Sequence, residues 1–340
     1  GNVAAGESSP MNRAQHALPP DRIVRLPRSP TEEAEWTYAT QRGHEILAAG
    51  KLAVVLAAGG QGTRLDFPKP KGMYPIGPIS GKSIFQLLAE QVLARSRQAE
   101  VDIPLYIMTS DATHAETVTF FQRNKYFGLS QGDVSFFQQG TMPVVDDKTG
   151  DLLRAQQGKL SNSPDGHGGM LAALSKVGLL EQMRDRGIDY IFYQQVDNPT
   201  VNVCDPAFIG FHVVRQSEMS TKVVVKRSAT EKVGIIVSID GKTRIIEYSN
   251  LPIETAQKTD ATGRLLLWCG NTAIHLFNRE FVARLVEDEQ TLPIHLAHKA
   301  VPYLDESGHR VTPDAPNAYK FERFIFDAMP LAQRTLVVEA

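Results

Sequence analysis

The sequence predicts an α/β protein with a doubly wound, mostly parallel mixed sheet and an antiparallel hairpin late in the chain. Short apolar runs of strand length alternate with helical patterns through most of the chain, as in consecutive βαβ units. An Asp-Gly pair between two β-rich runs then indicates the hairpin. At about 150 residues per domain, 340 residues suggest two domains, or one large α/β domain with an appendage.

The overall charge narrows the function classes. Lys plus Arg total 36 and Asp plus Glu total 38, so the formal charge is 36 − 38 = −2. This balance gives no bulk attraction to nucleic acid or anionic lipid. Apolar runs such as 52–58 and 265–269 are far shorter than the roughly 20 residues that span a bilayer. We therefore expect neither a nucleic-acid partner nor a membrane partner.

Cysteine and proline usage bears on location and domain limits. Only Cys204 and Cys269 occur, which is too few for a disulfide scaffold or a thiolate zinc site, so we expect a cytoplasmic protein. The first thirty residues carry five prolines and no apolar signal core. We expect 1–30 to be a disordered or loosely packed leader, and 31–340 to fold as one domain that begins with a helix.

The first predicted elements frame a glycine loop. Thr31 and the acids after it predict the start of a helix that runs from about 32 to 48 and is ended by Gly50. The apolar run 52–56 predicts a buried strand that opens directly into the glycine-rich segment 58–64.

Alternation of helices and strands continues beyond this loop. Ser83 predicts the cap of a helix, 104–109 a strand, and Asp111 the cap of a helix that ends near 123. Further strands are predicted at 134–138, 189–193 and 222–226, with helices near 169–185 and 206–216. The hairpin joins 233–239 to 243–248, and a helix at 319–329 and a strand at 335–338 follow.

The glycine loop is a candidate phosphate site. Gly59, Gly60 and Gly62 let the backbone approach phosphates closely, and Arg64 adds a bidentate cation. A dinucleotide site would need another glycine where Leu65 stands, and an acid ending a second strand about twenty residues on. A plain strand-to-helix turn remains the other alternative.

A basic segment follows the loop. In Pro68-Lys-Pro-Lys-Gly-Met73 the prolines keep the chain extended and Gly72 lets it bend, so Lys69 or Lys71 can lie over the glycines. Farther on, 77–83 has one residue too few between its glycines for a Walker A loop, so Lys82 is expected to be an ordinary surface lysine.

Leu56-Ala-Ala-Gly-Gly-Gln-Gly-Thr-Arg-Leu65 followed by Pro70-Lys-Gly-Met73 resembles the signature of the UDP-sugar pyrophosphorylases, nearest to the eukaryotic-type UDP-N-acetylglucosamine pyrophosphorylases. The resemblance covers roughly 50–338. Its further motifs, in the same order, are Phe136-Phe-Gln-Gln-Gly140, Ser163-Pro-Asp-Gly-His-Gly-Gly169, Val196-Asp-Asn198, Val233-Gly234, Ile246-Glu-Tyr-Ser249, Gly270-Asn271 and Pro316-Asn-Ala-Tyr-Lys-Phe-Glu322.

The resemblance implies a nucleotidyltransferase fold of the GT-A-like type and a reaction of UTP with a sugar 1-phosphate that yields UDP-sugar and pyrophosphate, with Mg²⁺ as cofactor. In-line attack on the α-phosphorus builds negative charge on the leaving pyrophosphate and needs no covalent nucleophile. By resemblance the catalytic cations are Arg64, Lys71 and Lys320. The implied nucleotide-binding residues are Ala58, Gly59, Gly60, Gly62, Thr63, Gln139 and Gly166.

Two of the implied roles have an independent chemical basis. The Gln139 amide offers the donor and acceptor that complement uracil N3–H and O4, and with backbone groups of Gly166 it would select UTP over CTP and purines. Asp197 follows an apolar strand at the edge where parallel sheets place ligands, and one carboxylate suits Mg²⁺. Alternatively, Asp197 only caps a turn and Gln139 only ends a strand.

The implied sugar-binding residues are His167, Gly234, Glu247, Tyr248 and Asn271. Tyr248 could instead be a core aromatic. His167 stands where the family typically has asparagine, and an imidazole that charges near pH 6.5 would leave the preference for an N-acetylated sugar open.

The hypotheses for the function are therefore of two kinds. One is a uridylyltransferase that makes UDP-N-acetylglucosamine, or a pyrophosphorylase preferring another hexose 1-phosphate such as that of glucose or galactose. The other is a catalytically idle UDP-sugar binding or sensor protein. The resemblance implies a further lysine segment and a C-terminal domain beyond Ala340, both of which we expect the chain to lack. The oligomeric state is left open.

Overall fold

The computed structural model describes residues 14–287 and 292–340. Its main feature is a ten-stranded mixed sheet in the order β1-β19-β11-β14-β10-β2-β3-β4, with β12 and β13 attached beside β14. The strands are β1 (Ile23–Val24), β2 (Leu52–Ala57), β3 (Leu105–Thr109), β4 (Val134–Gln138), β10 (Tyr190–Gln195), β11 (Met219–Val225), β12 (Ile235–Ile239), β13 (Lys242–Ile246), β14 (Cys269–Asn278) and β19 (Thr335–Glu339). The run β10-β2-β3-β4 is parallel throughout, and β14 is antiparallel to both β10 and β11.

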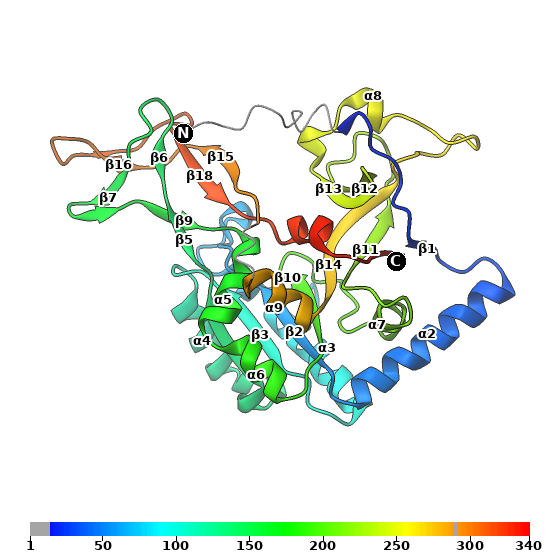
Figure 1. Cartoon of the computed structure of the whole chain (residues 1–340). Coiled ribbons are helices and arrows are strands. Elements are labelled where there is room, and N and C mark those ends of the chain that lie inside the picture. The colour runs from blue at the N-terminus through cyan, green and yellow to red at the C-terminus, as the bar shows by residue number, and fades with distance from the viewer. Residues whose placement is uncertain (1–13, 288–291) are drawn as a thin grey trace.

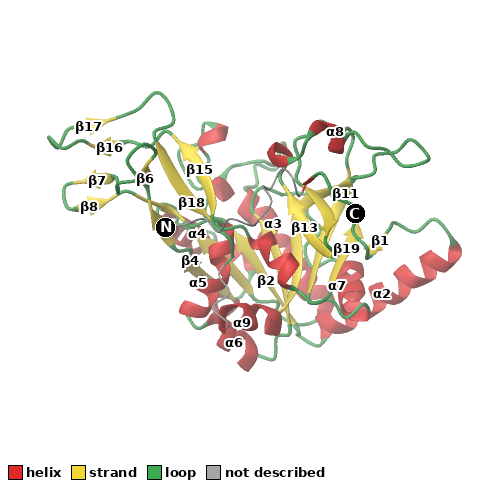
Figure 2. Cartoon of the chain, turned by 45° about the horizontal axis from the view of Figure 1, so that its top comes forward, coloured by secondary structure: helices red, strands yellow, loops and turns green. Residues whose placement is uncertain are grey.

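Helices cover both faces of this sheet (Figure 1, Figure 2). They are α2 (Pro30–Ala48), α3 (Ile84–Ala99), α4 (His114–Arg123), α5 (Met170–Lys176), α6 (Leu179–Asp185), α7 (Pro206–Val214), α8 (Ile253–Ala256) and α9 (Arg279–Glu287). The predicted doubly wound, mostly parallel fold with a late hairpin is confirmed. None of the helices in the described ranges is long and apolar enough to cross a membrane.

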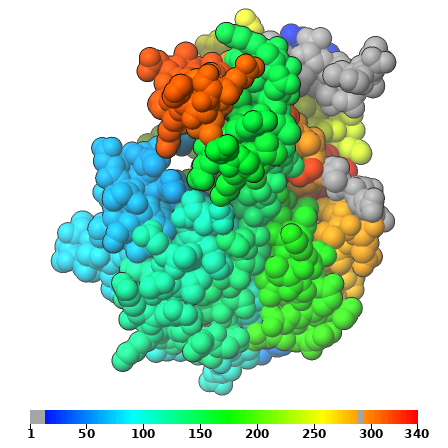
Figure 3. All heavy atoms as spheres, turned by 90° about the vertical axis from the view of Figure 1, so that its left-hand side faces the viewer, coloured from blue at the N-terminus to red at the C-terminus, as the bar shows by residue number. Residues whose placement is uncertain are grey.

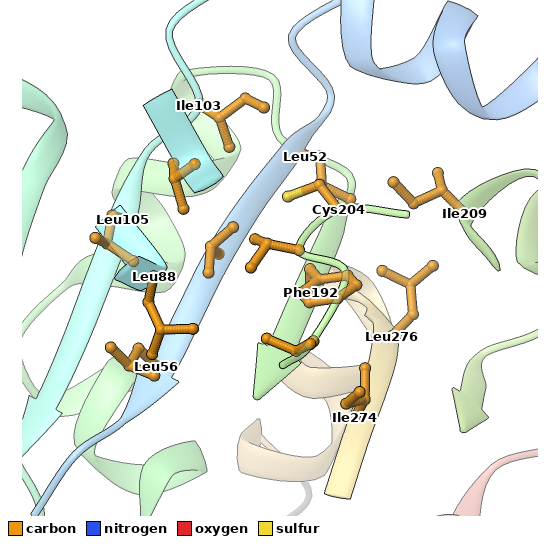
Figure 4. Close-up of a cluster of buried hydrophobic side chains, with 14 of the residues drawn as sticks. Leu52, Leu56, Leu88, Ile103, Leu105, Phe192, Cys204, Ile209, Ile274 and Leu276 are labelled. Carbon is orange, nitrogen blue, oxygen red and sulfur yellow. The ribbon is translucent and has the colours of Figure 1, made fainter. Parts of the chain in front are cut away.

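Alternate residues of β2 enter two different cores. Val54 and Leu56 pack with residues of α2, α3 and α7, a cluster that Figure 4 shows in part. Ala53 and Val55 pack on the opposite face with residues of α5, α6 and α9. Because successive side chains of a strand point to opposite faces, a continuous apolar run is what a doubly covered strand requires.

Two arms project from the body at one side (Figure 1). The first arm follows β4 and contains β5 (Thr141–Pro143), β6 (Val145–Asp146), β7 (Arg154–Gln156), β8 (Lys159–Leu160) and β9 (Asn162–Pro164). The second contains β15 (His295–Lys299), β16 (Tyr303–Leu304), β17 (Arg310–Val311) and β18 (Ala318–Glu322). The arms are joined because β18 pairs with both β15 and β6, and Figure 3 shows their green and orange tips side by side.

Two predicted helices and one strand differ from the sequence-based expectation. The helix predicted for 319–329 is instead strand β18 followed by the 3₁₀ helix η7 (Ile325–Leu331), because β15 supplies the backbone partners of β18. The helix predicted for 169–185 is divided into α5 and α6 by Gly178, which has a φ of 71°. Strand β14 was not predicted.

Two predicted helix caps were also misplaced. The Ser29 hydroxyl, rather than that of Thr31, accepts from the backbone N–H of Glu32 at the start of α2. Helix α4 begins at His114 after a turn built by Ser110 and Thr113, so Asp111 is not its cap.

The expected leader is partly integrated into the fold. Residues 1–13 lie outside the described residues. From Ala14 onward, Ala14 and Ala17 are buried, and β1 pairs in parallel with β19, so this part packs on the body rather than loosely. The folded domain therefore includes residues before the predicted limit at 31.

Helices α2 and α7 approach each other through two glycines. A Cβ on Gly43 would lie 1.8 Å from the carbonyl oxygen of Pro206, and one on Gly210 would lie 1.6 Å from that of Ala39. Glycine is therefore required at both positions.

Gly43→Ala is expected to destabilise the protein by about 3 kcal/mol, although alanine normally favours a helix by about 1 kcal/mol. The measurement is the free energy of unfolding in urea. Gly132→Ala serves as the control, since the nearest atom to its Cβ is 3.9 Å away. Equal stability of the two variants would contradict the prediction, because it would mean that α2 and α7 can move apart to accommodate a methyl group at little cost in free energy.

Candidate active site

Four parallel strands end side by side and place polar groups at one edge of the sheet. Gly59 follows β2, Ser110 follows β3, Gln139 follows β4 and Asp197 follows β10. The Ser110 hydroxyl donates to the carbonyl oxygen of Gly59 over 2.8 Å, and the backbone N–H of Gln139 donates to Thr109 over 2.9 Å. These bonds fix the strand ends relative to one another at the edge where parallel sheets bind ligands.

The basic segment folds back onto the glycine loop. The N–H of Gly62 donates to the carbonyl oxygen of Lys69 over 2.9 Å, and the N–H of Lys71 donates to that of Gly60 over 3.1 Å. A Cβ on Gly62 would lie 2.8 Å from the carbonyl oxygen of Phe67, so this close return requires glycine. The 3₁₀ helix η2 (Lys71–Met73) then begins at Lys71 and holds it over the loop.

Lys71 and Asp197 meet across this edge. Lys71 Nζ lies 2.8 Å from Asp197 Oδ1, and the side chains are 18% and 56% exposed. The two residues are 126 positions apart in the sequence, and the structure brings them together as an ion pair. Because the Asp197 carboxylate is more than half exposed, it remains open to a ligand.

Gln139 is set against the glycine loop. A Cβ on Gly59 would lie 2.2 Å from Gln139 Oε1, and Gln139 Nε2 donates to the carbonyl oxygen of Gly166 over 3.4 Å. Three of the residues with an expected nucleotide-binding role therefore converge. Gln139 also lines a cavity of about 900 Å³ between β4 and α5.

Asp165 is a buried carboxyl beside Gln139, and the motif Ser163–Gly169 that contains it did not predict a role for it. Its carboxyl occupies the space that Cβ atoms on Gly140 and Gly169 would fill. Burial raises the pKa of Asp165, which the charge of Arg323 opposes. Within the described chain, its Oδ1 atom has no hydrogen-bond partner.

Two backbone hydrogen bonds connect the segment 165–168 to the second arm. The N–H of Arg323 donates to the carbonyl oxygen of Asp165 over 2.7 Å, and the N–H of Gly168 donates to that of Arg323 over 2.8 Å. Gly166 has a φ of 84°, and a Cβ there would lie 2.4 Å from the carbonyl oxygen of Arg323. Glycine is required where the two chains cross.

Most of the expected sugar-binding residues form a second group. The N–H of Asn271 donates to the carbonyl oxygen of Gly234 over 2.8 Å, and a Cβ on Gly234 would lie 3.2 Å from Glu247 Oε1. Asn271 Oδ1 accepts from the N–H of Ala273 over 3.0 Å. Tyr248 is 48% exposed, so the alternative of a core aromatic is wrong.

His167 is a neutral imidazole rather than a group that charges near pH 6.5. Burial lowers its pKa to about 4, and the charge of His295 contributes in the same direction. Its Nδ1 accepts from the N–H of Ile325 over 3.1 Å, so the proton of the neutral ring is on Nε2. The ring stacks on Phe324 with centroids 5.3 Å apart. The expected charging fails because packing removes water from the ring.

A histidine–aspartate pair adjoins this group and was not expected. His295 Nε2 lies 2.7 Å from Asp327 Oδ2, and the His295 ring stacks on Phe324 at 4.5 Å. The hydrogen bond to Asp327 raises the pKa of His295, and the charges of Glu247 and Glu322 add to it. Burial raises the pKa of Glu247, whereas the charge of His295 lowers it.

The raised pKa of His295 predicts a pH-dependent contribution to stability. A histidine whose pKa is higher in the folded state stabilises the fold fully below its unfolded value of about 6.5, and this is lost as pH rises through the folded pKa. His295→Gln should therefore lower Tm most at pH 5.5 and progressively less above pH 6.5. The exposed His44→Gln is the control, and a Tm difference for His295→Gln that is the same at every pH would contradict the prediction.

Among the described residues, other expected site residues make no side-chain hydrogen bond or ion pair to the groups above. Thr63 and Arg64 lie in the exposed 3₁₀ helix η1 (Thr63–Leu65). Lys320 lies on β18 opposite Ala297, not on a helix as predicted. In residues 14–287 and 292–340, neither the Arg64 nor the Lys320 side chain makes a hydrogen bond or ion pair to another expected site residue.

Metal-binding groups are sparse at this edge. No cluster of three or more His, Cys, Asp or Glu side chains suited to a metal occurs among the described residues. Asp197 is an accessible single carboxylate, which fits Mg²⁺ because that ion usually keeps several waters and takes phosphate oxygens from its substrate.

The fold and the polar edge together define an α/β protein with polar groups at the carboxyl ends of its parallel strands, which is where ligands bind in sheets of this kind. The chain belongs to the UTP–glucose-1-phosphate uridylyltransferase family, whose sequence profile matches residues 8–328. The resemblance inferred from the ordered motifs is thereby confirmed.

Named relatives agree with this assignment. UDP-N-acetylhexosamine pyrophosphorylase-like protein 1 of Xenopus tropicalis is 39% identical over 330 residues, which cover 95% of this chain and 64% of that protein. The UDP-N-acetylglucosamine pyrophosphorylase of Saccharomyces cerevisiae is 39% identical over 315 residues, which cover 91% of this chain and 65% of the yeast protein. This chain thus spans 64–65% of the length of these two curated relatives.

A solved structure is also similar. The Trypanosoma brucei uridine diphosphate N-acetylglucosamine pyrophosphorylase, crystallised in complex with an inhibitor, superposes with a TM-score of 0.83 at 29% identity. The match covers 97% of this chain and 70% of the trypanosomal chain.

Proposed function

We propose that this chain transfers the uridylyl group of UTP to a sugar 1-phosphate, N-acetylglucosamine 1-phosphate first among them, and releases pyrophosphate. The observation that carries the proposal is the Lys71–Asp197 pair, which lies beside the glycine loop where four parallel strands end. The names of the relatives support this class of reaction.

In the proposed reaction an oxygen of the sugar phosphate attacks the α-phosphorus of UTP, and the bond to the β-phosphate oxygen breaks. Negative charge then grows on the departing pyrophosphate, so cations placed there lower the barrier. Lys71, Arg64 and Lys320 are the proposed cations, and N–H groups of the segment from Ala58 to Thr63 hold the phosphate chain.

Base recognition is assigned to Gln139 and Gly166. The contact between Gln139 Oε1 and the glycine loop limits the amide to a small range of orientations. An oriented amide can pair with uracil N3–H and O4 but not with the reversed donor and acceptor of cytosine.

Asp197 is the proposed Mg²⁺ ligand, together with water and phosphate oxygens. When bound, Mg²⁺ would neutralise charge on the phosphates. Lys71 is the present partner of Asp197, so binding of UTP and Mg²⁺ would release Lys71 toward the phosphate chain.

The sugar is assigned to the group formed by Gly234, Glu247 and Asn271, with Tyr248 and His167 beside it. Glu247 would accept hydrogen bonds from sugar hydroxyls, and the neutral His167 would donate from Nε2. The two buried, unpaired cysteines suit a reducing compartment, and we place the protein in the cytoplasm, with neither nucleic-acid nor membrane partners.

The test is pyrophosphate release from UTP and Mg²⁺ with the 1-phosphates of N-acetylglucosamine, N-acetylgalactosamine, glucose and galactose. We expect release, fastest with an N-acetylated sugar. Release with glucose or galactose alone would favour another hexose pyrophosphorylase. No release with any sugar, combined with calorimetric UDP-sugar binding, would favour an idle UDP-sugar binding protein, an alternative motivated by the exposed position of Arg64 on η1.

A further inference from the structure

A second cavity, of about 600 Å³, lies outside the candidate active site. It is bounded by the chain before α2, the end of β11 and the loop that leads into β14. In Figure 1 this is the side of β1 and of the yellow loop beyond α8, opposite the two arms. Its ionisable lining residues are Arg25, Arg28, Lys226, Arg227, Arg264 and Asp260. They carry five positive charges and one negative, a net charge of 5 − 1 = +4.

Lys226 gives this cavity a buried cation. The residue is 5% exposed, and its Nζ makes only a 3.4 Å hydrogen bond to the carbonyl oxygen of Ala229. Among the described residues, no carboxylate lies within ion-pair distance of it. The nearby Glu231 carboxylate acts on Lys226 only from beyond ion-pair distance and accepts a hydrogen bond from the N–H of Arg227 over 2.7 Å, so an anion brought to the Lys226 ammonium would gain a favourable interaction. Burial lowers the pKa of Lys226, and the charge of Glu231 opposes this shift.

Arg25 is held in place at the cavity wall. Its guanidinium lies 3.6 Å from the centroid of the Trp268 ring and 3.6 Å from Glu339 Oε2. A planar guanidinium stacked on an aromatic ring retains in-plane donors for a second acceptor. Arg25 is therefore oriented before any ligand arrives.

Among the described residues, the one acid of the lining forms no ion pair with the arginines, although hydrogen bonds from Thr262 and Arg264, and after them the charge of Arg264, lower the pKa of Asp260. Asp260 Oδ1 accepts hydrogen bonds from the N–H of Thr262, the hydroxyl of Thr262 and the N–H of Arg264. In the part of the chain that the structure describes, the side chains of Arg28, Arg227 and Arg264 make no ion pair. The Asp260 carboxylate is thus used to shape its own loop, and three guanidinium groups remain available.

We propose that this cavity is a second anion site, which binds a phosphorylated small molecule carrying at least two phosphate groups. Lys226 would take one phosphate at the base of the cavity, and the arginines of the rim would take the other in bidentate fashion. When the Glu339 carboxylate paired with Arg25 is included, the net charge is 4 − 1 = +3, which a ligand of about three negative charges matches and a single carboxylate does not. The site lies beyond β14 in the sheet order and shares no lining residue with the glycine loop.

The experiment is isothermal titration of the whole chain with inorganic triphosphate, a probe that has no base and no sugar. We expect two classes of site in the wild type, one at the glycine loop and one at this cavity. The double variant Arg28→Gln with Arg264→Gln should weaken triphosphate binding at this cavity at least tenfold. It should leave the affinity of the glycine-loop class unchanged. Lys226→Met should act on the cavity class, and Lys71→Ala on the glycine-loop class.

Arg123→Gln with Arg310→Gln is the matched control, because it removes the same charge from two exposed arginines elsewhere. The double variant at Arg28 and Arg264 alters exposed side chains, so a folded protein is available even if Lys226→Met unfolds. A single class of site unaffected by Arg28→Gln with Arg264→Gln, or an equal loss in the control, would overturn the proposal. If the variants of this cavity lose triphosphate binding and Lys71→Ala leaves all triphosphate binding unchanged, the proposed function would be rejected and the second anion site would be supported.

Discussion

Lys71→Ala is expected to lower turnover by about 10²- to 10³-fold, the usual effect of removing one group that stabilises developing charge. The lysine is held over the glycine loop by backbone pairing and lies 2.8 Å from Asp197. In the proposed reaction its charge would stabilise the departing pyrophosphate, which is absent from UDP-sugar. The affinity for UDP-N-acetylglucosamine should therefore change much less than kcat. Stopped assays of pyrophosphate release and calorimetry of the product measure the two effects.

Lys82→Ala is the matched control for this variant. It removes the same charge from a lysine whose Nζ lies 2.6 Å from Glu90 on helix α3 and has no expected site role. An unchanged kcat in Lys71→Ala, or an equal fall in both variants, would contradict the assignment. The stability of Lys71→Ala should remain near that of the wild type, because ion pairs open to solvent contribute little.

Gln139→Ala is expected to reduce the preference for UTP over CTP by about 10- to 100-fold, which corresponds to the roughly 1–3 kcal/mol that a buried polar group costs when its hydrogen-bond partner is removed. The amide lies against Gly59 and Gly166, so its orientation is set before the base binds. The measurement is the ratio of kcat/KM for UTP to that for CTP, with one sugar 1-phosphate.

Gln138→Ala tests the same chemistry at the exposed neighbour on β4. It should leave the UTP preference unchanged. If Gln139→Ala slows UTP and CTP equally, then this residue supports the strand ends and does not read the base.

The parallel half of the fold followed directly from local sequence patterns. Continuous apolar runs identified β2 and β3, and Ser83 identified the start of α3 through its cap. In each of these elements the local preference and the tertiary environment agree. The sequence was therefore sufficient there.

The later elements depended on partners that are distant in the chain. Residues 318–322 alternate in character and pair with β15, but the apolar spacing of Phe321, Phe324, Ile325 and Ala328 also suits a helix. Strand β14 contains Gly270 and Asn271, which local preference disfavours in strands. Tertiary hydrogen bonds decided both cases.

In the candidate site, too, some residues belong to recognisable sequence motifs and others are brought together only by folding. Lys71, Asp197 and Gln139 belong to motifs whose order indicated one site, and their roles stay predictions. His295 and Asp327 carry no signal, since a single histidine and a single aspartate have no characteristic spacing. The pKa of His295 is raised chiefly because folding places it against Asp327, with Glu247 and Glu322 nearby.

The two backbone hydrogen bonds of Arg323, to Asp165 and from Gly168, tie the second arm to the loop that contains Gly166. Both backbone bonds lie a few residues beyond Lys320 on the same continuous strand and turn. If the second arm moved relative to the sheet, Lys320 and Gly166 would therefore move together. If Lys320 and Gly166 have the roles proposed above, pyrophosphate and base would be released in one concerted movement.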